Sequence, residues 1–288
     1  MRQEFFAASG RELVPVPEHL QRPVPVLPAS SFQLTAGTSL LDFVRAGAAV
    51  PSIKPLSFEE LNLDRGMVHY SAKAVLPKGE SVLKIRGLHD RAYVWIDGIL
   101  AGVLTDVQGD TGLSLKGPGG LSRLEILVEN QGRVNYGPYF GQGKGILDGV
   151  LVNQRYVFHW EQRAIDLELP LDDLLHQGAA APGVSEVTAS SGDSVAGWFH
   201  GAFDVAETAD TFLALPGSGK GFVWLNGFML GRFWEVGPQV TLYVPKPLVR
   251  VGANHVTVLE LEHGTGFGEL REDANLGKTG VTYVEHLG

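Results

Sequence analysis

The chain of 288 residues lacks cysteine altogether, which excludes disulfide bonds, thiol catalysis and zinc sites built on thiolates. It also lacks a long apolar run, so no segment has the length expected of a membrane-spanning helix or a secretory signal. Lysine and arginine form no run, and the formal net charge is −9, which argues against nucleic acid and anionic membranes as partners. From these absences we expect a cytoplasmic protein that uses no metal ion and no cofactor.

Glycine and proline are abundant instead, with 37 and 16 residues. Together they favour many short strands joined by tight turns, as in β-sandwich domains. No long helical pattern and no alternation of strands with helices is visible, so this chain does not encode a catalytic α/β barrel. Its length corresponds to about two domains.

One segment occurs twice. Residues 222–232 read FVWLNGFMLGR, and residues 93–103 read YVWIDGILAGV. Trp224 lies 129 residues after Trp95, and the Asn-Gly and Asp-Gly pairs that follow keep the same offset. An offset this long indicates a duplicated domain, because solenoid repeats span only about 20–50 residues. Each copy joins an apolar strand to the strongest short hairpin signal, which predicts two related β-sandwich modules.

The expected fold is all-β: two tandem jelly-roll β-sandwiches, similar to galactose-binding domains, behind an N-terminal extended tether. Within residues 1–30, Arg2 to Ala8 could form one or two helical turns, and the prolines from Pro15 to Pro28 make the rest an extended connector rather than a helix or a central strand. Residues 31–54 are expected to hold an edge strand and a connector. The first jelly roll is expected over residues 55–178, a polar loop over 179–193, and the second jelly roll over 194–288.

The alternation of apolar and polar residues predicts individual strands within both modules. In the first module they are expected at residues 68–75, 81–85, 92–96, 100–104, 124–128, 150–158 and 165–169. In the second module they are expected at residues 198–205, 211–215, 221–225, 229–233, 239–244 and 255–261. Between the modules, Leu171 to His176 is expected to form a short helix at most.

Several longer strings resemble the β-domains of glycoside hydrolase family 35, the acid-type β-galactosidases. They are KGFVWLNG (220–227), LGRFW (230–234), GPQVTLYVP (237–245), LHDRAYV (88–94), VENQGRVNYG (128–137) and GKGI (143–146). The resemblance covers essentially all of the chain. It implies the C-terminal, non-barrel region of such an enzyme, built from tandem jelly rolls.

In that family a (β/α)8 barrel with two catalytic glutamates precedes the jelly rolls. Residues 1–8 resemble the last barrel helix, so the missing barrel is the partner that the resemblance implies. Galactosides and further copies of the chain are the other partners we expect from it. The family's catalytic glutamates have no matching positions here, and we expect no catalytic residue. Glu260 and Glu262 share one face of a predicted strand, but we expect that face to be exposed to solvent.

The second tryptophan hairpin offers one candidate binding set: Trp224, Asn226, Arg232 and Trp234. Aromatic faces stack on the C–H groups of sugars, while amides and guanidinium groups hydrogen-bond to hydroxyls. A structural interpretation stands beside this one. In it Trp224 belongs to the core, Asn226 forms a type I′ turn, and Arg232 stacks on Trp234.

The glycine-rich loop over residues 130–145 offers the other set: Arg133, Asn135 and Tyr136. Long ordered loops in compact domains are often functional or dock on another domain. The resemblance implies that this loop faces the barrel, where Tyr136 would help to form the wall of the substrate mouth. A purely structural interdomain contact is the alternative.

The leading hypothesis is a non-catalytic region that braces the barrel and shapes the pocket of a β-galactosidase acting on terminal β-D-galactosyl residues. Two alternatives remain. The chain could be an autonomous carbohydrate-binding module, because the hairpins combine aromatic and amide side chains. It could also be an interaction subunit of a split β-galactosidase, because it starts at a domain edge.

Overall fold

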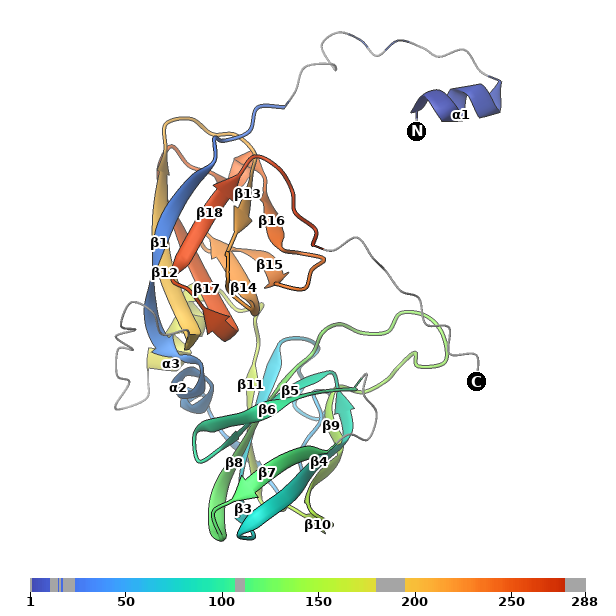
Figure 1. The fold of residues 1–288 in the computed structure, drawn as a ribbon, viewed down its shortest axis with the longest axis vertical. Coiled ribbons are helices and arrows are strands. Elements are labelled where there is room, and N and C mark those ends of the chain that lie inside the picture. Colours follow the sequence, from blue (N-terminus) through green and yellow to red (C-terminus); the bar gives the residue numbers. More distant parts are fainter. Residues whose placement is uncertain are drawn as a thin grey trace.

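The computed structural model describes residues 2–10, 15, 17, 24–106, 112–179 and 195–277. Within these residues the chain forms two antiparallel β-sandwiches, one above the other in Figure 1, which confirms the all-β prediction. Helices are short: α1 spans Arg2–Ser9, α2 spans Leu40–Ala46 and α3 spans Leu171–Ala179. Apart from Ala179, the loop expected over residues 179–193 lies outside the described residues.

The first sandwich pairs a six-stranded sheet, in the order β2-β11-β3-β8-β5-β6, with a four-stranded sheet, in the order β10-β9-β4-β7. Its core lies between the sheets, where alternate residues of each strand point inward. Its strands are β2 Val50–Ser52, β3 Met67–Leu76, β4 Gly79–His89, β5 Arg91–Ile96, β6 Ile99–Thr105, β7 Leu113–Gly117, β8 Gly120–Glu129, β9 Gly145–Val152, β10 Arg155–Tyr156 and β11 Trp160–Ile165.

The second sandwich has eight strands in the hydrogen-bonded order β15-β14-β17-β12-β1-β18-β13-β16. A separate core cluster fills it. Its strands are β1 Ser30–Ser39, β12 Val195–Val205, β13 Thr211–Ala214, β14 Lys220–Leu225, β15 Phe228–Trp234, β16 Thr241–Val244, β17 Gly252–Gly264 and β18 Phe267–Arg271, with a 3-10 turn at Lys246–Leu248.

Strand β1 differs from the edge strand that the sequence led us to expect. It has a partner on each side, because Leu34 pairs with Gly201 of β12 and Phe32 pairs with Gly268 of β18. Helix α2 follows directly, with the Ser39 hydroxyl accepting a hydrogen bond from a backbone N–H in its first turn. By its pairing β1 belongs to the second sandwich, so the first sandwich is inserted between β1 and β12 (Figure 1).

The two tryptophan hairpins have the same geometry, as the duplication predicts. Both residues of each turn have positive φ: 50° and 85° from Asp97 onward, and 52° and 85° from Asn226 onward. This is the backbone of a type I′ turn, in which Asn-Gly and Asp-Gly are preferred. Each hairpin also has an irregularity in register directly before its tryptophan, Trp95 or Trp224.

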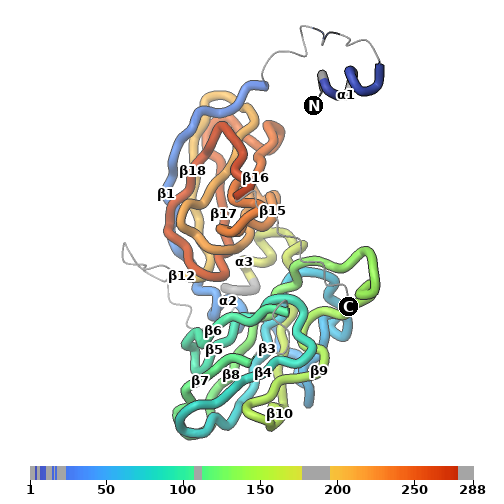
Figure 2. The backbone as a smooth tube through the Cα atoms, turned by 45° about the vertical axis from the view of Figure 1, so that its right-hand side comes forward, coloured from blue at the N-terminus to red at the C-terminus, as the bar shows by residue number. Residues whose placement is uncertain are grey.

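The sandwiches pack on each other through equivalent faces of these hairpins, and Figure 2 shows α2 and α3 between them. Trp198 lies 5.4 Å from Trp224 and 5.2 Å from Phe43 of α2, measured between ring centroids. This apolar cluster, the junction core, consists of Leu40, Phe43, Val44, Met67, Tyr93, Trp95, Leu127, Ile165, Leu167, Leu174, Trp198, Phe222, Trp224, Leu259 and Leu261.

The contact between β1 and β12 yields a test. A Cβ on Gly201 would lie 2.3 Å from the carbonyl oxygen of Gln33, so a side chain here would push the two strands apart. We expect Gly201→Ala to lower the free energy of unfolding by about 1–3 kcal/mol, as overpacking does elsewhere. Chemical denaturation measures this. Gly120→Ala is the matched control, because nothing lies within 4 Å of its Cβ, and an equal loss there would contradict the interpretation.

Candidate functional site

A buried carboxylate organises the polar side of the junction. Glu129, the last residue of β8, has a fully buried side chain and forms ion pairs with Lys220 Nζ of β14 and with Arg232 Nε of β15, the latter at 2.8 Å. Burial lowers the pKa of Lys220 to about 8, although the charge of Glu129 opposes this shift. Lys220 Nζ also lies 4.6 Å from the ring centroid of Trp234.

A second ion pair crosses the same junction. Arg91 of β5 donates to Glu262 of β17 at 2.7 Å, and the Tyr93 hydroxyl donates to the same carboxylate oxygen at 3.1 Å. The guanidinium of Arg91 lies 5.4 Å from the ring centroid of Trp234. Trp234 therefore contacts Arg91 and Lys220, whereas Arg232, the expected stacking partner, lies over Phe222.

A cleft of 480 Å³ opens where the sandwiches meet. Arg232 reaches into it and donates to the backbone carbonyls of Asn130, at 3.1 Å, and of Gln131, at 3.4 Å. Arg133 lines the same cleft, so the structure brings together two candidate residues that lie far apart in the sequence. Leu167 and Phe222 supply apolar walls between them.

The loop between β8 and β9 starts at this cleft and is anchored at its base. Arg133 Nη1 donates to Glu59 at 2.7 Å, and its Nε donates to the backbone carbonyl of Asp64 at 2.8 Å. Although burial opposes it, the hydrogen bonds from Arg133 and from the backbone N–H of Lys144 hold the pKa of Glu59 below its usual value. At the other end of the loop, Lys144 Nζ lies 2.6 Å from a carboxylate oxygen of Asp90.

Beyond this base the loop carries uncovered aromatic side chains. Tyr136 is 89% exposed, and Tyr139 and Phe140 are also exposed. Asn135 lies on the same exposed stretch. We call these three exposed aromatic residues, Tyr136, Tyr139 and Phe140, together with the exposed Val134 beside them, the aromatic tip of the loop. The candidate residues Asn135 and Tyr136 are therefore accessible.

Trp224 and Asn226 do not line the cleft. Trp224 is 2% exposed and belongs to the junction core. The Asn226 amide donates to the carbonyl of Leu248 at 2.9 Å and to Asn254 Oδ1 at 3.0 Å, while its oxygen accepts from the N–H of His255. Trp224 and Asn226 therefore have the structural roles, in the core and in the turn, that the sequence analysis gave as the alternative to sugar binding.

We expected the strand face that carries Glu260 to be exposed to solvent, and the structure shows that this expectation is wrong. Glu260 is fully buried, and its Oε1 accepts the backbone N–H groups of Lys220, Glu262 and His263 at 2.9–3.1 Å. Its Oε2 has no hydrogen-bond partner among the described residues. Burial raises the pKa of Glu260 to about 6, although the three backbone hydrogen bonds oppose this shift. Glu262 is bound to Arg91 instead, so the two carboxylates do not act as a pair.

Among the described residues, His89, Asp90 and Asp106 could each offer one ligand atom to a metal ion. The buried ammonium of Lys144 already neutralises Asp90, and His89 Nδ1 lies 3.5 Å from Asp106. The cluster is thus satisfied internally by side chains of this chain.

Two family models match the chain. One, described as the first all-beta domain of β-galactosidase, covers residues 55–166, and the other, described as the galactose-binding domain of β-galactosidase, covers residues 196–254. The chain belongs to the β-galactosidase family. Within that family it carries two of the all-β domains, which confirms the resemblance seen in the sequence.

Curated members of the family give the same result. The β-galactosidase-1-like protein of Mus musculus is 38% identical over 231 residues, which is 78% of this chain and 35% of that protein. The β-galactosidase of Homo sapiens is 35% identical over 244 residues, 79% of this chain and 35% of the human protein. This chain therefore spans about 35% of the length of the curated relatives it matches.

Among solved structures, a GH2 β-galacturonidase from Eisenbergiella tayi matches 84% of this chain and 38% of that chain, with 12% identity and a TM-score of 0.30. A TM-score this low does not establish a shared fold. In the part of the chain that the structure describes, no helix combines the length and apolarity needed to cross a membrane.

The ion pair at the junction predicts a large effect of one substitution. Lys220→Ala leaves the buried Glu129 with Arg232 alone, and breaking such a pair costs about 3–5 kcal/mol of unfolding free energy. Urea denaturation measures the loss. The control is Arg65→Ala, which removes an exposed pair with Glu168 and should cost less than about 1 kcal/mol. Equal losses for both variants would contradict a special role for Glu129.

The burial of Glu260 predicts a pH-dependent effect. The folded-state pKa, about 6, lies above the unfolded value of 4.5, so the folded chain binds more protons between these pH values and stability falls as pH rises through them. Above pH 6 the full cost of about 2 kcal/mol applies. We expect Glu260→Gln to stabilise the chain by that amount more at pH 7.5 than at pH 4. A stability difference that is the same at both pH values would contradict this.

Proposed function

We propose that this chain is the non-catalytic β-sandwich region of a β-galactosidase that hydrolyses terminal β-D-galactosyl residues. In this proposal it braces the catalytic domain and completes one wall of the galactoside pocket, and the protein works in the cytoplasm. Membership of the family supports the proposal. So does the length of the curated relatives, because 65% of each lies outside the match and leaves room for a catalytic domain.

The aromatic tip of the loop after β8 is the observation that carries this proposal. Exposed apolar clusters on a protein surface mark interaction sites, and here four large side chains gather on one loop. The loop is anchored by Arg133 and Glu59 on one side and by Lys144 and Asp90 on the other. A loop fixed at its base loses less conformational entropy when it docks, which favours binding.

The tip also has the chemistry of a sugar-contacting wall. Aromatic rings present flat apolar faces with a negative quadrupole, which suit the C–H groups of a galactosyl ring. The hydroxyl of Tyr136 and the amide of Asn135 can hydrogen-bond to sugar hydroxyls. In this proposal the catalytic domain packs against the rest of the tip and supplies the two carboxylates that retaining hydrolysis requires.

The test compares this chain with a longer polypeptide in which a β-galactosidase catalytic domain precedes it. We expect no hydrolysis of an aryl β-galactoside by the 288-residue chain alone. In the longer polypeptide, Tyr136→Ala should lower kcat/KM about tenfold, equivalent to about 1.4 kcal/mol of lost contact.

The matched control is Tyr243→Ala, which removes an exposed tyrosine from β16 of the second sandwich and should leave kcat/KM unchanged. Two results would overturn the proposal. One is hydrolysis by the 288-residue chain that disappears when a carboxylate of this chain is replaced. The other is an unchanged kcat/KM in the Tyr136→Ala variant.

A further inference from the structure

The sheet edges of the first sandwich differ in how well they are protected from pairing with another chain. An edge strand presents unpaired backbone N–H and C=O groups, and proteins block such edges with short strands, charged side chains and prolines. Strand β2 has three residues and contains Pro51, β10 has two residues and contains Arg155, and β7 carries Lys116. In the part of the chain that the structure describes, three of the four edge strands of this sandwich are therefore blocked.

Strand β6 is the fourth edge, and it lacks these blocking residues. Its seven residues, ILAGVLT over 99–105, include no charged residue and no proline. Among the described residues, the backbone of β6 is hydrogen-bonded to β5 and to no other strand, so its other side is open. One extra residue, Ala101, interrupts the register close to the turn, and regular pairing with β5 runs from Gly102 to Thr105. This regular stretch is the part of the edge that another strand could join.

Apolar side chains continue from this edge onto the surface around it. Ile99 is 75% exposed and Leu100 is 51% exposed. Val103 and Leu41 of α2 are partly buried against the junction core, and α2 lies beside the turn of this hairpin (Figure 1). A strand added to β6 would cover Ile99 and Leu100 as well as the open backbone. Burial of this apolar surface favours association.

The equivalent strand of the second sandwich, β15, is protected. It carries Arg232, whose guanidinium pairs with Glu129, and it contacts β16 at the other end of its own sheet. The N–H of Trp234, the last residue of β15, donates to the carbonyl of Gln239 at 3.1 Å. The two hairpins therefore share one geometry, but only the first of them leaves an uncharged and open strand.

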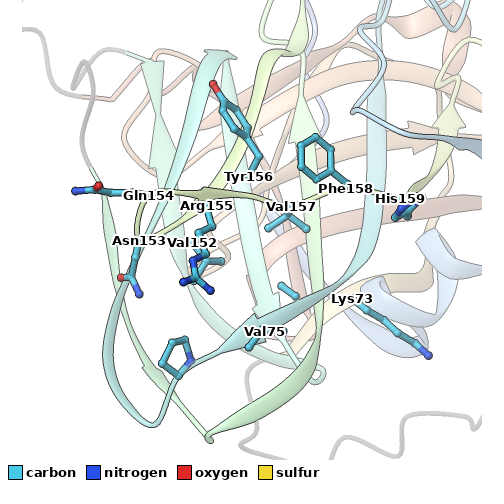
Figure 3. A pocket seen from close by; sticks show the side chains of 12 residues that line it. Lys73, Val75, Val152, Asn153, Gln154, Arg155, Tyr156, Val157, Phe158 and His159 are labelled. Atoms are coloured by element: carbon cyan, nitrogen blue, oxygen red, sulfur yellow. The ribbon is translucent and has the colours of Figure 1, made fainter.

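A specific foreign peptide does not suit this edge. When a peptide adds a strand to a sheet, pockets for its alternate side chains give specificity. A groove of 740 Å³ lies beside β10 (Figure 3), and the cleft of 480 Å³ lies at the junction, but no residue of β6 lines either of them. A strand without charge also offers no ion pair that could select a foreign sequence.

A second copy of this chain fits the edge better. When two identical strands pair antiparallel about a twofold axis, residues close to the axis face their own copies, so a charged residue there would meet a like charge. Strand β6 carries no charge and avoids this repulsion. The whole chain has a net charge of −9, so two copies approach each other most readily through a neutral surface of this kind.

We propose that two copies of this chain associate by antiparallel pairing of their β6 strands, which joins the two six-stranded sheets into one continuous sheet. The pairing satisfies the open N–H and C=O groups of both edges and covers Ile99 and Leu100. One strand of each copy makes an interface smaller than the about 1,600 Å² of a standard stable complex, so we expect a dissociation constant in the micromolar range. This inference goes beyond the proposed function, because the contact uses neither the cleft nor the aromatic tip.

The experiment combines sedimentation velocity of the 288-residue chain, from about 1 to 300 µM, with hydrogen exchange read by mass spectrometry. Sedimentation should show a monomer–dimer equilibrium. Exchange of the amides of residues 99–105 should slow about fivefold between the lowest and the highest concentration, because N–H groups of the open edge become hydrogen-bonded in the dimer. This measurement locates the contact without any substitution.

A charge placed on the edge should weaken the dimer. Leu100→Lys should raise the dissociation constant about tenfold or more, and Thr105→Lys, at the other end of β6, should also raise it. The matched control is Phe228→Lys at the start of the equivalent strand β15, where the side chain is 55% exposed, compared with 51% for Leu100. This control and Tyr136→Ala, which alters the aromatic tip, should both leave the dissociation constant unchanged.

Three results would overturn the proposal. They are a monomer at every concentration, an association that Leu100→Lys leaves unchanged, and an association that slows exchange only outside residues 99–105. The activity test with Tyr136→Ala in the longer polypeptide uses no residue of β6, so failure of either proposal is distinguishable from failure of the other.

Discussion

A carboxylate buried between two domains must be neutralised where it lies, and the structure depends on how Glu129 meets this requirement. Its partners, Lys220 and Arg232, come from the other sandwich, so the charge is balanced only when the two sandwiches pack in one orientation. The remaining N–H groups of Arg232 hold the carbonyls at the start of the loop after β8. The direction in which the aromatic tip projects thus follows from the same contact that joins the sandwiches.

The duplication explains why the junction has this form. Equivalent hairpin residues, Tyr93 with Phe222 and Trp95 with Trp224, supply its two apolar sides, so matching faces of the two hairpins cover each other. The copies kept the type I′ turn, whose positive φ values allow few residues. They diverged where charge was needed, because the partners of Glu129 lie only in the second copy.

Local features of this fold could be predicted from the sequence, and long-range ones could not. Alternating apolar residues, with an Asp-Gly turn in the first hairpin and an Asn-Gly turn in the second, predicted the strands around both tryptophans. The pattern missed the two partners of β1, because pairing between residues far apart in sequence leaves no local signal. The two-residue period of a strand placed Glu260 and Glu262 on one face, but this period does not determine which face of the strand is buried. The sequence offered Arg232 as a candidate residue, but its hydrogen bonds to the carbonyls of Asn130 and Gln131 depend on how the sandwiches pack and could not be predicted.

The insertion of the first sandwich between β1 and β12 has a consequence for synthesis on the ribosome. Residues 50–165 are contiguous, so the first sandwich can fold as soon as they have emerged. Strand β1 emerges before them, but both of its neighbours, β12 and β18, are translated only after the whole first sandwich. The nascent chain must therefore carry an unpaired strand while more than half of the polypeptide is made. Polar and apolar residues alternate along β1, so the unpaired strand is not uniformly apolar. Its burial is completed only when β12 and β18 pair with it.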